Sequence, residues 1–378
     1  MTSINVPLGE QSYDVLVKAG ALNGVGALLQ RTLGDSTGRR VLLVADAAIA
    51  ETHAERVAAS LEEAGFAVSF ASIEAVETNK TIEVLEALLE TAAREHIDRS
   101  GAVVAVGGGI VGDLGGFLAA SWLRGIPVLQ VPTTLLAMVD ASIGGKTGVN
   151  LPLPDGALGK NLVGAFWQPL AVVADPQTLV SLPRRERACG FAECIKHGVI
   201  ADWPLLEELR SRAPDVLDGD IKACGSLVAR CAAIKVNVVG VDVREETGPG
   251  GGVARAFLNL GHTFAHAIEP MHELGLKHGE AVAIGLVAAG ACARQLGHWT
   301  QAESDELNAT LEACGLPNSL PQPVDARRLL EHMGWDKKVR QGTLTIIVPT
   351  GRGQVDMLRG PDESLLLAGW QAVGASVR

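Results

Sequence analysis

Basic residues are outnumbered in this sequence of 378 residues, in which 32 lysines and arginines stand against 43 aspartates and glutamates. The formal net charge is −11. Nucleic acids and anionic membranes bind proteins through an excess of positive charge. The composition therefore argues against both as general partners, whereas an anionic small molecule is still accommodated if lysines and arginines gather around it.

Two further features are missing. The six cysteines form no Cys-x-x-Cys pair, which is typical of reduced, mostly buried thiols. No uninterrupted apolar run is long enough to span a bilayer, and residues 1–15 lack a signal-peptide layout. We therefore expect a soluble, cytoplasmic protein with no membrane partner. Hydrophobic residues make up 47% of the chain, and this content, together with the length, predicts two domains with a large core.

The first half of the chain alternates between strand and helix patterns. After an N-terminal hairpin, strands are predicted at residues 40–45, 67–73, 102–106, 128–131 and 172–176, and helices at 22–33, 54–64, 81–96 and 110–121. This alternation is typical of a parallel α/β domain. After residue 182 helical periodicity dominates, with helices predicted at residues 187–200, 203–212, 220–239, 260–272, 280–296 and 302–314, and one late strand at 343–348. We predict an α/β domain over residues 1–180 and a mainly helical domain over residues 181–378.

A glycine turn at residues 107–109 separates the strand at 102–106 from the following helix. Exposed N–H groups and the positive end of the helix dipole favour anions at such a turn. The spacing Gly107-x-Gly109-x-x-Gly112 also matches the dinucleotide fingerprint. No acidic residue follows about 20 positions later to hold a ribose, as it does in the usual fingerprint. Asp46, at the end of the earlier strand, is an alternative for that role.

A second candidate site lies in the helical half. His262 and His266 are four residues apart and share one helix face, and His278 follows twelve residues later. Histidines with this spacing are typical ligands of a divalent metal. Spacing alone makes all three histidines ligands and leaves open whether Glu193 or Glu280 completes the set.

Taken together, these blocks resemble one family, the 3-dehydroquinate synthases, over nearly the whole chain. The motifs that carry the resemblance are residues 107–113, 122–125, 131–136, 139–150, 159–161, 182–186, 192–196, 258–266, 278–280 and 336–338. The resemblance implies a Rossmann-like α/β domain that binds NAD and a helical domain with one catalytic divalent metal. That metal is expected to be Zn²⁺, with Co²⁺ as a substitute.

Motif by motif, the resemblance implies Glu193, His262 and His278 as metal ligands and His266 as a nearby acid–base residue instead of a fourth ligand. A catalytic metal keeps positions open for substrate oxygens. The implied substrate contacts are Arg124, Asp140, Lys146, Asn161, Lys196, Lys235, Arg255, Asn259 and one of Lys337 and Lys338. The implied cofactor contacts are Asp46, Glu77, Lys80, Gly108, Gly109, Ile110, Asp113, Thr133, Thr134, Lys160, Ser181 and Glu186.

The implied reaction converts a phosphorylated seven-carbon sugar acid, 3-deoxy-D-arabino-heptulosonate 7-phosphate, to 3-dehydroquinate and phosphate, a step of the shikimate pathway toward chorismate and the aromatic amino acids. NAD⁺ takes a hydride from the substrate, phosphate leaves, and the hydride returns before the ring recloses. NAD is therefore recycled within one turnover. The two anionic ends of this substrate explain why an acidic chain would concentrate cationic side chains at one site.

The sequence is also compatible with three alternative functions. A sister sugar-phosphate cyclase, such as an aminodehydroquinate, 2-deoxy-scyllo-inosose or epi-valiolone synthase, would share most of these residues. A metal-dependent alcohol or glycerol dehydrogenase would share the glycine turn and the metal domain, but would release NADH. A non-enzymatic binding module would not need the intact set of Glu193 and three histidines. The family also suggests a homodimer. Residues 151–158 and 247–254 lengthen two loops relative to the family pattern, which we interpret as tolerated loop growth.

Overall fold

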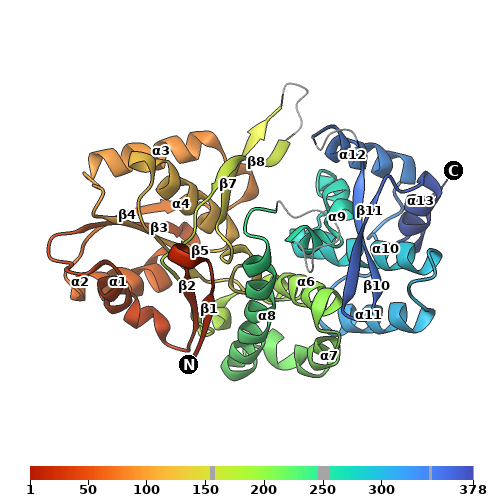
Figure 1. Cartoon of the computed structure of the whole chain (residues 1–378), viewed down its shortest axis with the longest axis horizontal. Coiled ribbons are helices and arrows are strands. Elements are labelled where there is room, and N and C mark those ends of the chain that lie inside the picture. The colour runs from red at the N-terminus through yellow and green to blue at the C-terminus, as the bar shows by residue number, and fades with distance from the viewer. Residues whose placement is uncertain (154–157, 246–254, 340–342, 378) are drawn as a thin grey trace. The chain divides into compact units, whose positions relative to one another are not determined.

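The computed structural model describes the following parts of the chain: residues 1–153, 158–245, 255–339 and 343–377. Residues 154–157 of the first lengthened loop and the whole of the second, 247–254, lie outside the described residues. The chain forms two compact units (Figure 1). The first comprises Met1–Leu182 and Gly219–Val243, and the second comprises Pro183–Asp218 and Arg244–Arg378.

The first unit is built on a seven-stranded sheet in the order β1-β2-β9-β6-β5-β3-β4. The strands are β1 Thr2–Val6, β2 Tyr13–Val17, β3 Arg40–Asp46, β4 Ala67–Ile73, β5 Ala102–Gly107, β6 Val128–Pro132 and β9 Ala171–Ala174. Only β1 runs antiparallel to its neighbour, and every other pairing in this sheet is parallel. Every residue of β5 is buried, because helices cover both faces of a parallel sheet.

Alternate residues of the strands enter two separate cores. On β3, Val41 and Leu43 pack with α1 (Val25–Leu33) and α2 (Glu55–Glu63). Leu42 and Val44 point to the opposite face, toward α3 (Ile82–Arg94) and α4 (Gly109–Ser121). Figure 1 shows these two helix pairs on opposite sides of the sheet. Helix α3 begins where the Thr81 hydroxyl accepts a hydrogen bond from the backbone N–H of Val84.

The chain order reverses between β3 and β5. From β3 the chain moves outward to β4, and it then crosses back to form β5 on the other side of β3. At such a reversal the connections leaving two neighbouring strands diverge, and in open α/β sheets ligands bind beside the carboxyl ends of those strands. Here these ends are Asp46 and Gly107.

Four elements of the first unit differ from the prediction. An antiparallel hairpin, β7 (Lys146–Pro152) and β8 (Leu158–Phe166), follows a π-helical turn, η7 (Ala137–Ala141). The sequence pattern predicts helix α8 (Ile221–Val241) as part of the second domain. It belongs to the first unit because it packs on β1, β2 and η7.

Among the described helices, α8 is the one that is long and apolar enough to cross a membrane by length and composition, and half of its most apolar window is buried inside the protein. Its charged residues include Lys235, which is buried and paired with Asp140 of η7. The helix begins at Asp220, whose carboxylate accepts a hydrogen bond from Ala223 N–H at 2.7 Å. These contacts are those of a helix packed in the core of its unit.

The second unit is mainly helical. Its helices are α6 Arg184–Ala201, α7 Pro204–Leu217, α9 His262–Ile268, α10 His278–Gln295, α11 Gln301–Ala313, α12 Ala326–Val339 and α13 Glu363–Ala372. Helix α10 lies at the centre and contacts α6, α9, α11 and α13. The predicted late strand exists as β10 (Thr345–Gly351), paired with β11 (Gln354–Arg359). The single helix predicted over 260–272 is wrong: α9 ends before Pro270, which cannot continue a helix.

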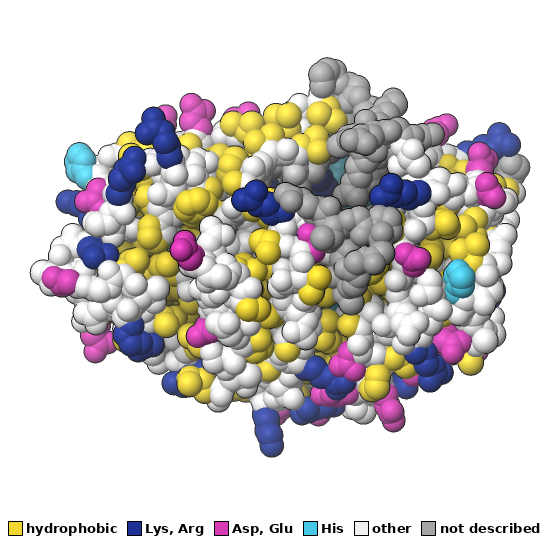
Figure 2. Space-filling view, viewed as in Figure 1, with side chains coloured by type: hydrophobic (Ala, Val, Ile, Leu, Met, Phe, Trp, Pro, Cys, Tyr) yellow, Lys and Arg dark blue, Asp and Glu magenta, His cyan; other side chains and the backbone are white. Residues whose placement is uncertain are grey.

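The remaining short elements connect these parts. They are α5 Thr178–Ser181, the 3₁₀ turns η1 Gly9–Gln11, η2 Ala21–Gly24, η3 Ala47–Ile49, η5 Glu77–Asn79, η6 Trp122–Arg124, η8 Arg255–Asn259 and η9 His272–Leu274, and the π turn η4 Ala50–Ala54. On the face shown in Figure 2, lysine and arginine side chains are interspersed with aspartates and glutamates. Local groups of charges, more than the net charge, therefore decide where an anion binds.

Buried Asp175 is expected to be a main stabilising residue of the first unit. Its carboxylate accepts hydrogen bonds from the backbone N–H groups of Gly20, Leu22 and Gln177 at 2.9, 3.2 and 3.0 Å. Because a buried donor left without an acceptor costs about 1–3 kcal/mol, Asp175→Ala should lower the free energy of unfolding by roughly 3 kcal/mol or more. Urea unfolding, with amide exchange of β9 as the local probe, measures the loss.

The control for this prediction is Asp14→Ala, the same change at an exposed aspartate of β2. It should change the free energy of unfolding by no more than about 0.5 kcal/mol. Equal effects of the two substitutions would show that the buried carboxylate contributes nothing beyond an ordinary surface charge.

Candidate functional site

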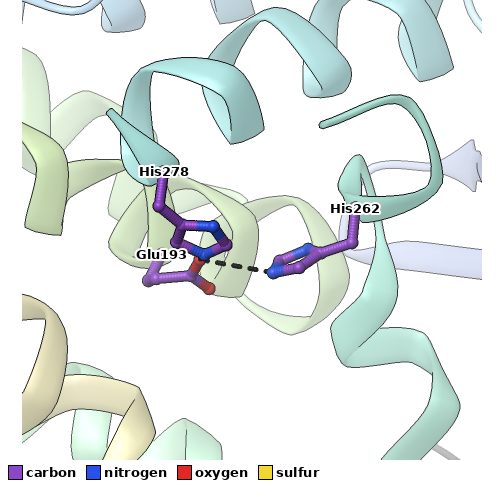
Figure 3. A group of neighbouring side chains, drawn as sticks. All are labelled: Glu193, His262 and His278. Carbon is purple, nitrogen blue, oxygen red and sulfur yellow. Dashed lines mark ion pairs between the residues drawn. The ribbon is translucent and has the colours of Figure 1, made fainter. Parts of the chain in front are cut away.

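Three side chains of the second unit form a group that could hold a metal ion. Glu193 lies in the middle of α6, His262 is the first residue of α9, and His278 is the first residue of α10. One potential ligand atom from each lies within 4.8 Å of the others. Figure 3 shows the three side chains converging from these helices. A carboxylate with two imidazoles is a typical zinc-binding set that leaves further positions open.

Two close backbone approaches bring these ligands together. A Cβ atom on Gly279 would lie 2.3 Å from the carbonyl oxygen of Cys189, one turn before Glu193 on α6. A Cβ atom on Gly285 would lie 2.1 Å from the carbonyl oxygen of Gly261, next to His262. Both contacts are shorter than real Cβ atoms allow. Helix α10 can therefore approach α6 and the start of α9 only because glycine occupies both positions.

The two carboxylate oxygens of Glu193 face different groups. Oε2 is paired with the Lys196 ammonium, and the two side chains are each 1% exposed. Oε1 lies 3.6 Å from Nε2 of His262 and 3.8 Å from Nε2 of His278. The Lys196 charge favours the ionised carboxylate, and Oε1 is the oxygen that faces both imidazoles.

The other ring nitrogens fix the orientation of both imidazoles. Nδ1 of His262 lies 3.2 Å from the Leu260 carbonyl oxygen, and Nδ1 of His278 lies 2.7 Å from Oε1 of Glu269. Both acceptors need a proton on Nδ1, and in the neutral imidazole this leaves the lone pair of Nε2 facing the site. Burial, followed by the nearby Lys196 charge, lowers the pKa of His262 to about 3. His262 is therefore neutral, as a metal ligand must be.

Spacing alone leaves open whether Glu280 and His266 are metal ligands, and their contacts bear on this question. Glu280 receives two hydrogen bonds from Arg185, at 2.6 and 2.7 Å, and one from the Lys277 N–H at 2.8 Å. Burial raises the pKa of Glu280, but the Arg185 and Lys277 contacts outweigh it and lower the pKa overall. Glu280 thus caps α10. His266 is exposed, and its ring centre lies 5.7 Å from that of His262.

In the first unit, several predicted cofactor contacts lie at the carboxyl edge of the sheet. Asp46 ends β3 and accepts a hydrogen bond from Ala48 N–H at 3.1 Å. Gly108 precedes α4, whose first residues are Gly109 and Ile110. Thr133 and Thr134 follow β6, and Thr133 N–H donates to the Gly107 carbonyl at 2.9 Å. Strand ends, the glycine turn and the N-terminus of α4 therefore meet where the strand order reverses.

A partly buried polar network lies next to this edge. Lys80 donates to the carboxylate of Asp113 and to the side-chain oxygen of Asn161. Asn150 connects Asn161 with Glu77. It accepts a hydrogen bond from Asn161 N–H at 3.0 Å and donates one to Glu77 Oε1 at 2.7 Å. Burial raises the pKa of Asp113, and the Lys80 charge partly offsets this effect.

The remaining predicted residues are distributed over both units. In the first unit, Lys235 pairs with Asp140, whereas Lys146 and Arg124 are exposed. Lys160 lies on β8. The hydroxyl of Ser181 lies 2.9 Å from Nε2 of His53. In the second unit, Arg255 is buried, Asn259 donates to Glu245 at 2.9 Å, and Glu186 pairs with Lys277. Lys337 and Lys338 belong to α12, but their side chains lie outside the described residues.

Sequence patterns gave no role to Lys277, which pairs with Glu186, or to three further residues that contact predicted site residues. These three are Glu269 beside His278, Glu245 beside Asn259, and His53 beside Ser181. Each is a single polar residue in a loop or at a helix end, and no spacing rule marks such positions. Asn150 ends a motif of the resemblance, but it had no assigned role.

Comparisons with known proteins match both halves of the chain. Family models described as 3-dehydroquinate synthase N-terminal and C-terminal match residues 70–189 and 190–339. The chain is 45% identical over 349 residues to a 3-dehydroquinate synthase of Symbiobacterium thermophilum, covering 92% of this chain and 94% of the relative. It is 41% identical to the enzyme of that name from Caulobacter vibrioides, with 97% of each chain covered.

Several solved structures share the fold of this chain. A 2-epi-5-epi-valiolone synthase from Streptomyces hygroscopicus, determined with NAD⁺ and Zn²⁺ bound, has a TM-score of 0.83 at 25% identity, with 96% of each chain covered. A 2-deoxy-scyllo-inosose synthase, complexed with carbaglucose-6-phosphate, NAD⁺ and Co²⁺, has a TM-score of 0.85 at 23% identity and 99% coverage of each chain. A probable glycerol dehydrogenase from Sinorhizobium meliloti has a lower TM-score, 0.63 at 16% identity, with 94% of each chain covered.

Proposed function

The chain belongs to the 3-dehydroquinate synthase family, and from this premise we propose that it converts 3-deoxy-D-arabino-heptulosonate 7-phosphate to 3-dehydroquinate and phosphate. The observation that carries the proposal is the convergence of Glu193, His262 and His278 in a chain 40–45% identical to enzymes of that name over nearly its whole length. The proposed role is a phosphate-eliminating lyase of the shikimate pathway.

We propose that Glu193, His262 and His278 hold Zn²⁺, or Co²⁺ as a substitute. The donor set of one carboxylate oxygen and two Nε2 atoms suits either ion. When bound, the metal supplies a Lewis acid for a substrate hydroxyl. Lys196 favours ionised Glu193, and the His262 imidazole stays neutral. His266 is exposed beside His262, and we assign it the transfer of protons to or from substrate oxygens.

We propose that the first unit binds NAD at the carboxyl ends of β3 and β5. Asp46 is suited to a ribose hydroxyl, and the turn before α4 is suited to the pyrophosphate. When bound, NAD⁺ supplies a hydride acceptor that is regenerated in the same turnover. The contacts that we assign to the cofactor are Asp46, Glu77, Lys80, Gly108, Gly109, Ile110, Asp113, Thr133, Thr134, Lys160, Ser181 and Glu186.

The substrate's carboxylate and phosphate are proposed to be bound by cationic side chains of this chain. Lys235 is buried against Asp140, so the pair presents a cation whose orientation is fixed. Lys146 is exposed at the start of β7, where its ammonium can reach a dissolved anion. The proposed substrate contacts are Arg124, Asp140, Lys146, Asn161, Lys196, Lys235, Arg255, Asn259, and one of Lys337 and Lys338.

Two broader proposals accompany this assignment. We propose that residues 1–180 form the NAD-binding domain and residues 181–378 the metal- and substrate-binding domain, with α8 packed on the former. We also propose a cytoplasmic homodimer, supported by the family resemblance and by six buried, unbridged cysteines. Sedimentation equilibrium at micromolar concentration tests the dimer, and a single species with the 39.4 kDa chain mass would contradict it.

We expect phosphate release from the heptulosonate phosphate to require NAD⁺ and a divalent metal, without net formation of NADH. The hydride taken from the substrate returns to it, so absorbance of reduced nicotinamide should stay flat while phosphate accumulates over many turnovers. A stoichiometric rise of NADH would instead support the dehydrogenase alternative. No phosphate release from this substrate, together with turnover of another sugar phosphate, would support a sister cyclase.

A further inference from the structure

Helix α9 lies between His262 and Glu269. His262 is its first residue, and Glu269 directly follows its last residue, Ile268. The Glu269 N–H still donates to the Ala265 carbonyl at 3.0 Å, so the helix backbone holds this residue in place. Pro270 comes next and prevents the helix from continuing. The last turn of α9 therefore holds the backbone of Glu269.

The carboxylate of Glu269 contacts a metal-ligand candidate on another helix. Its Oε1 lies 2.7 Å from Nδ1 of His278. The Glu269 side chain is only 7% exposed, whereas the His278 side chain is 41% exposed. An exposed side chain at the first position of a helix samples several rotamers unless a contact selects one of them. Here a buried carboxylate provides that contact.

The two histidines differ in how they are held. His262 is mostly enclosed and donates to a neutral acceptor, the Leu260 carbonyl. His278 is more open and donates to a charged acceptor. A carboxylate behind an imidazole fixes the tautomer and the ring plane, and it makes the other nitrogen a stronger donor to a metal. The metal affinity should therefore depend more on Glu269 than on the Leu260 carbonyl.

We propose that Glu269 is a positioning residue of the metal site, which holds the Nδ1 proton of His278 and directs Nε2 toward Glu193. This inference rests on the proposed function, because it presumes that the three side chains bind a metal. Glu269 itself lies behind the imidazole and is not a ligand in this proposal. Its effect should appear first in metal affinity and in the metal's spectrum, and only through these in turnover.

The test compares Glu269→Ala and Glu269→Gln with the wild-type protein. Zn²⁺ affinity is measured by competition with a chromophoric chelator, and Co²⁺-loaded proteins are compared by their visible spectra. Loss of a carboxylate behind a ligating histidine typically costs about 10–100-fold in metal affinity, and we expect this loss for Glu269→Ala. Glu269→Gln keeps an oxygen that can accept the Nδ1 proton, so its loss should be smaller and its Co²⁺ spectrum closer to wild type.

The matched control is Glu273→Ala, in the same connection between α9 and α10. Glu273 is 48% exposed and pairs with Arg328, so its removal should leave Zn²⁺ affinity within about twofold of wild type. Saturating metal should restore most of kcat in both Glu269 variants. Unchanged thermal unfolding of the metal-free variants excludes a general loss of structure, and if Glu269→Ala does not fold, the nearly isosteric Glu269→Gln decides the question.

The outcomes separate this inference from the proposed function. If the wild type binds one metal and both Glu269 variants bind it equally well with unchanged Co²⁺ spectra, the positioning role is wrong and the proposed function stands. If Glu273→Ala weakens the metal as much as Glu269→Ala does, the effect is one of general charge and the positioning role is again wrong. If the wild type binds no metal, the proposed function fails and this inference fails with it.

Discussion

His278→Ala is expected to remove the bound metal and to lower kcat/KM by at least about three orders of magnitude, because Lewis-acid stabilisation by a metal contributes several kcal/mol. Position 278 suits this test because the substitution should disturb the packing of the protein very little. The His278 side chain is 41% exposed, so its removal leaves little buried space unfilled. Metal content by atomic absorption and phosphate release measure the two effects.

Glu193→Gln should also remove the metal, but with an additional cost. It eliminates the negative charge beside the buried Lys196 ammonium, and breaking a buried ion pair by removing one member typically costs about 3–5 kcal/mol. A drop in thermal stability should therefore accompany Glu193→Gln and not His278→Ala. The control for His278→Ala is His272→Ala, because His272 is an exposed histidine of η9. A His278→Ala protein with stoichiometric metal and normal turnover would overturn the ligand assignment.

The central strands of the sheet could be predicted from sequence because they are nearly continuous apolar runs. Residues 102–107 are buried throughout, and only a strand covered on both faces gives such a run at this length between a turn and a helix. The β7–β8 hairpin could not be predicted in the same way. Its strands contain several glycines and polar residues, and no alternation of apolar and polar residues marks them.

The metal site was only partly predictable. The spacing of His262, His266 and His278 indicated a metal, and the family resemblance selected Glu193 over Glu280. The physical reason for that choice is tertiary: Glu280 is engaged by Arg185, and Glu193 reaches the two imidazoles from α6. Periodicity within one helix cannot show which side chains of another helix lie opposite. The same limit hid Glu269, whose proposed role rests on one 2.7 Å contact with His278.

The division of the chain shows a similar limit. The change from strands to helices near residue 182 is visible in the sequence, and the compact units also divide there. Helix α8 has the same helical pattern as its neighbours in sequence, so pattern alone assigned it to the helical domain. Its contacts with β1, β2 and η7 place it in the first unit. Apolar periodicity shows which face of a helix is buried, but it does not show which element that face packs against.

Gly279→Ala is expected to disrupt the metal site by adding one methyl group. The new Cβ would lie 2.3 Å from the Cys189 carbonyl oxygen and 2.7 Å from two further backbone atoms of Cys189, and backbone cannot move aside as a flexible side chain can. The start of α10 must therefore separate from α6, which moves His278 away from Glu193. Overpacking of this kind costs about 1–3 kcal/mol or more, and a displacement of about 1 Å at a catalytic site can lower turnover about 100-fold.

Gly334→Ala in α12 is the matched control for this change, since a Cβ there meets nothing within 4 Å. It should leave Zn²⁺ affinity and turnover unchanged and should stabilise the helix by about 0.5–1 kcal/mol, because alanine is the better helix former. Zn²⁺ competition, thermal unfolding and phosphate release are compared for both variants. If Gly279→Ala kept wild-type metal affinity and turnover, close contact between α10 and α6 would not be what holds the three ligands together. If Gly279→Ala lost metal affinity and turnover while Gly334→Ala kept them, the absence of a side chain at position 279 would be shown to determine where His278 lies.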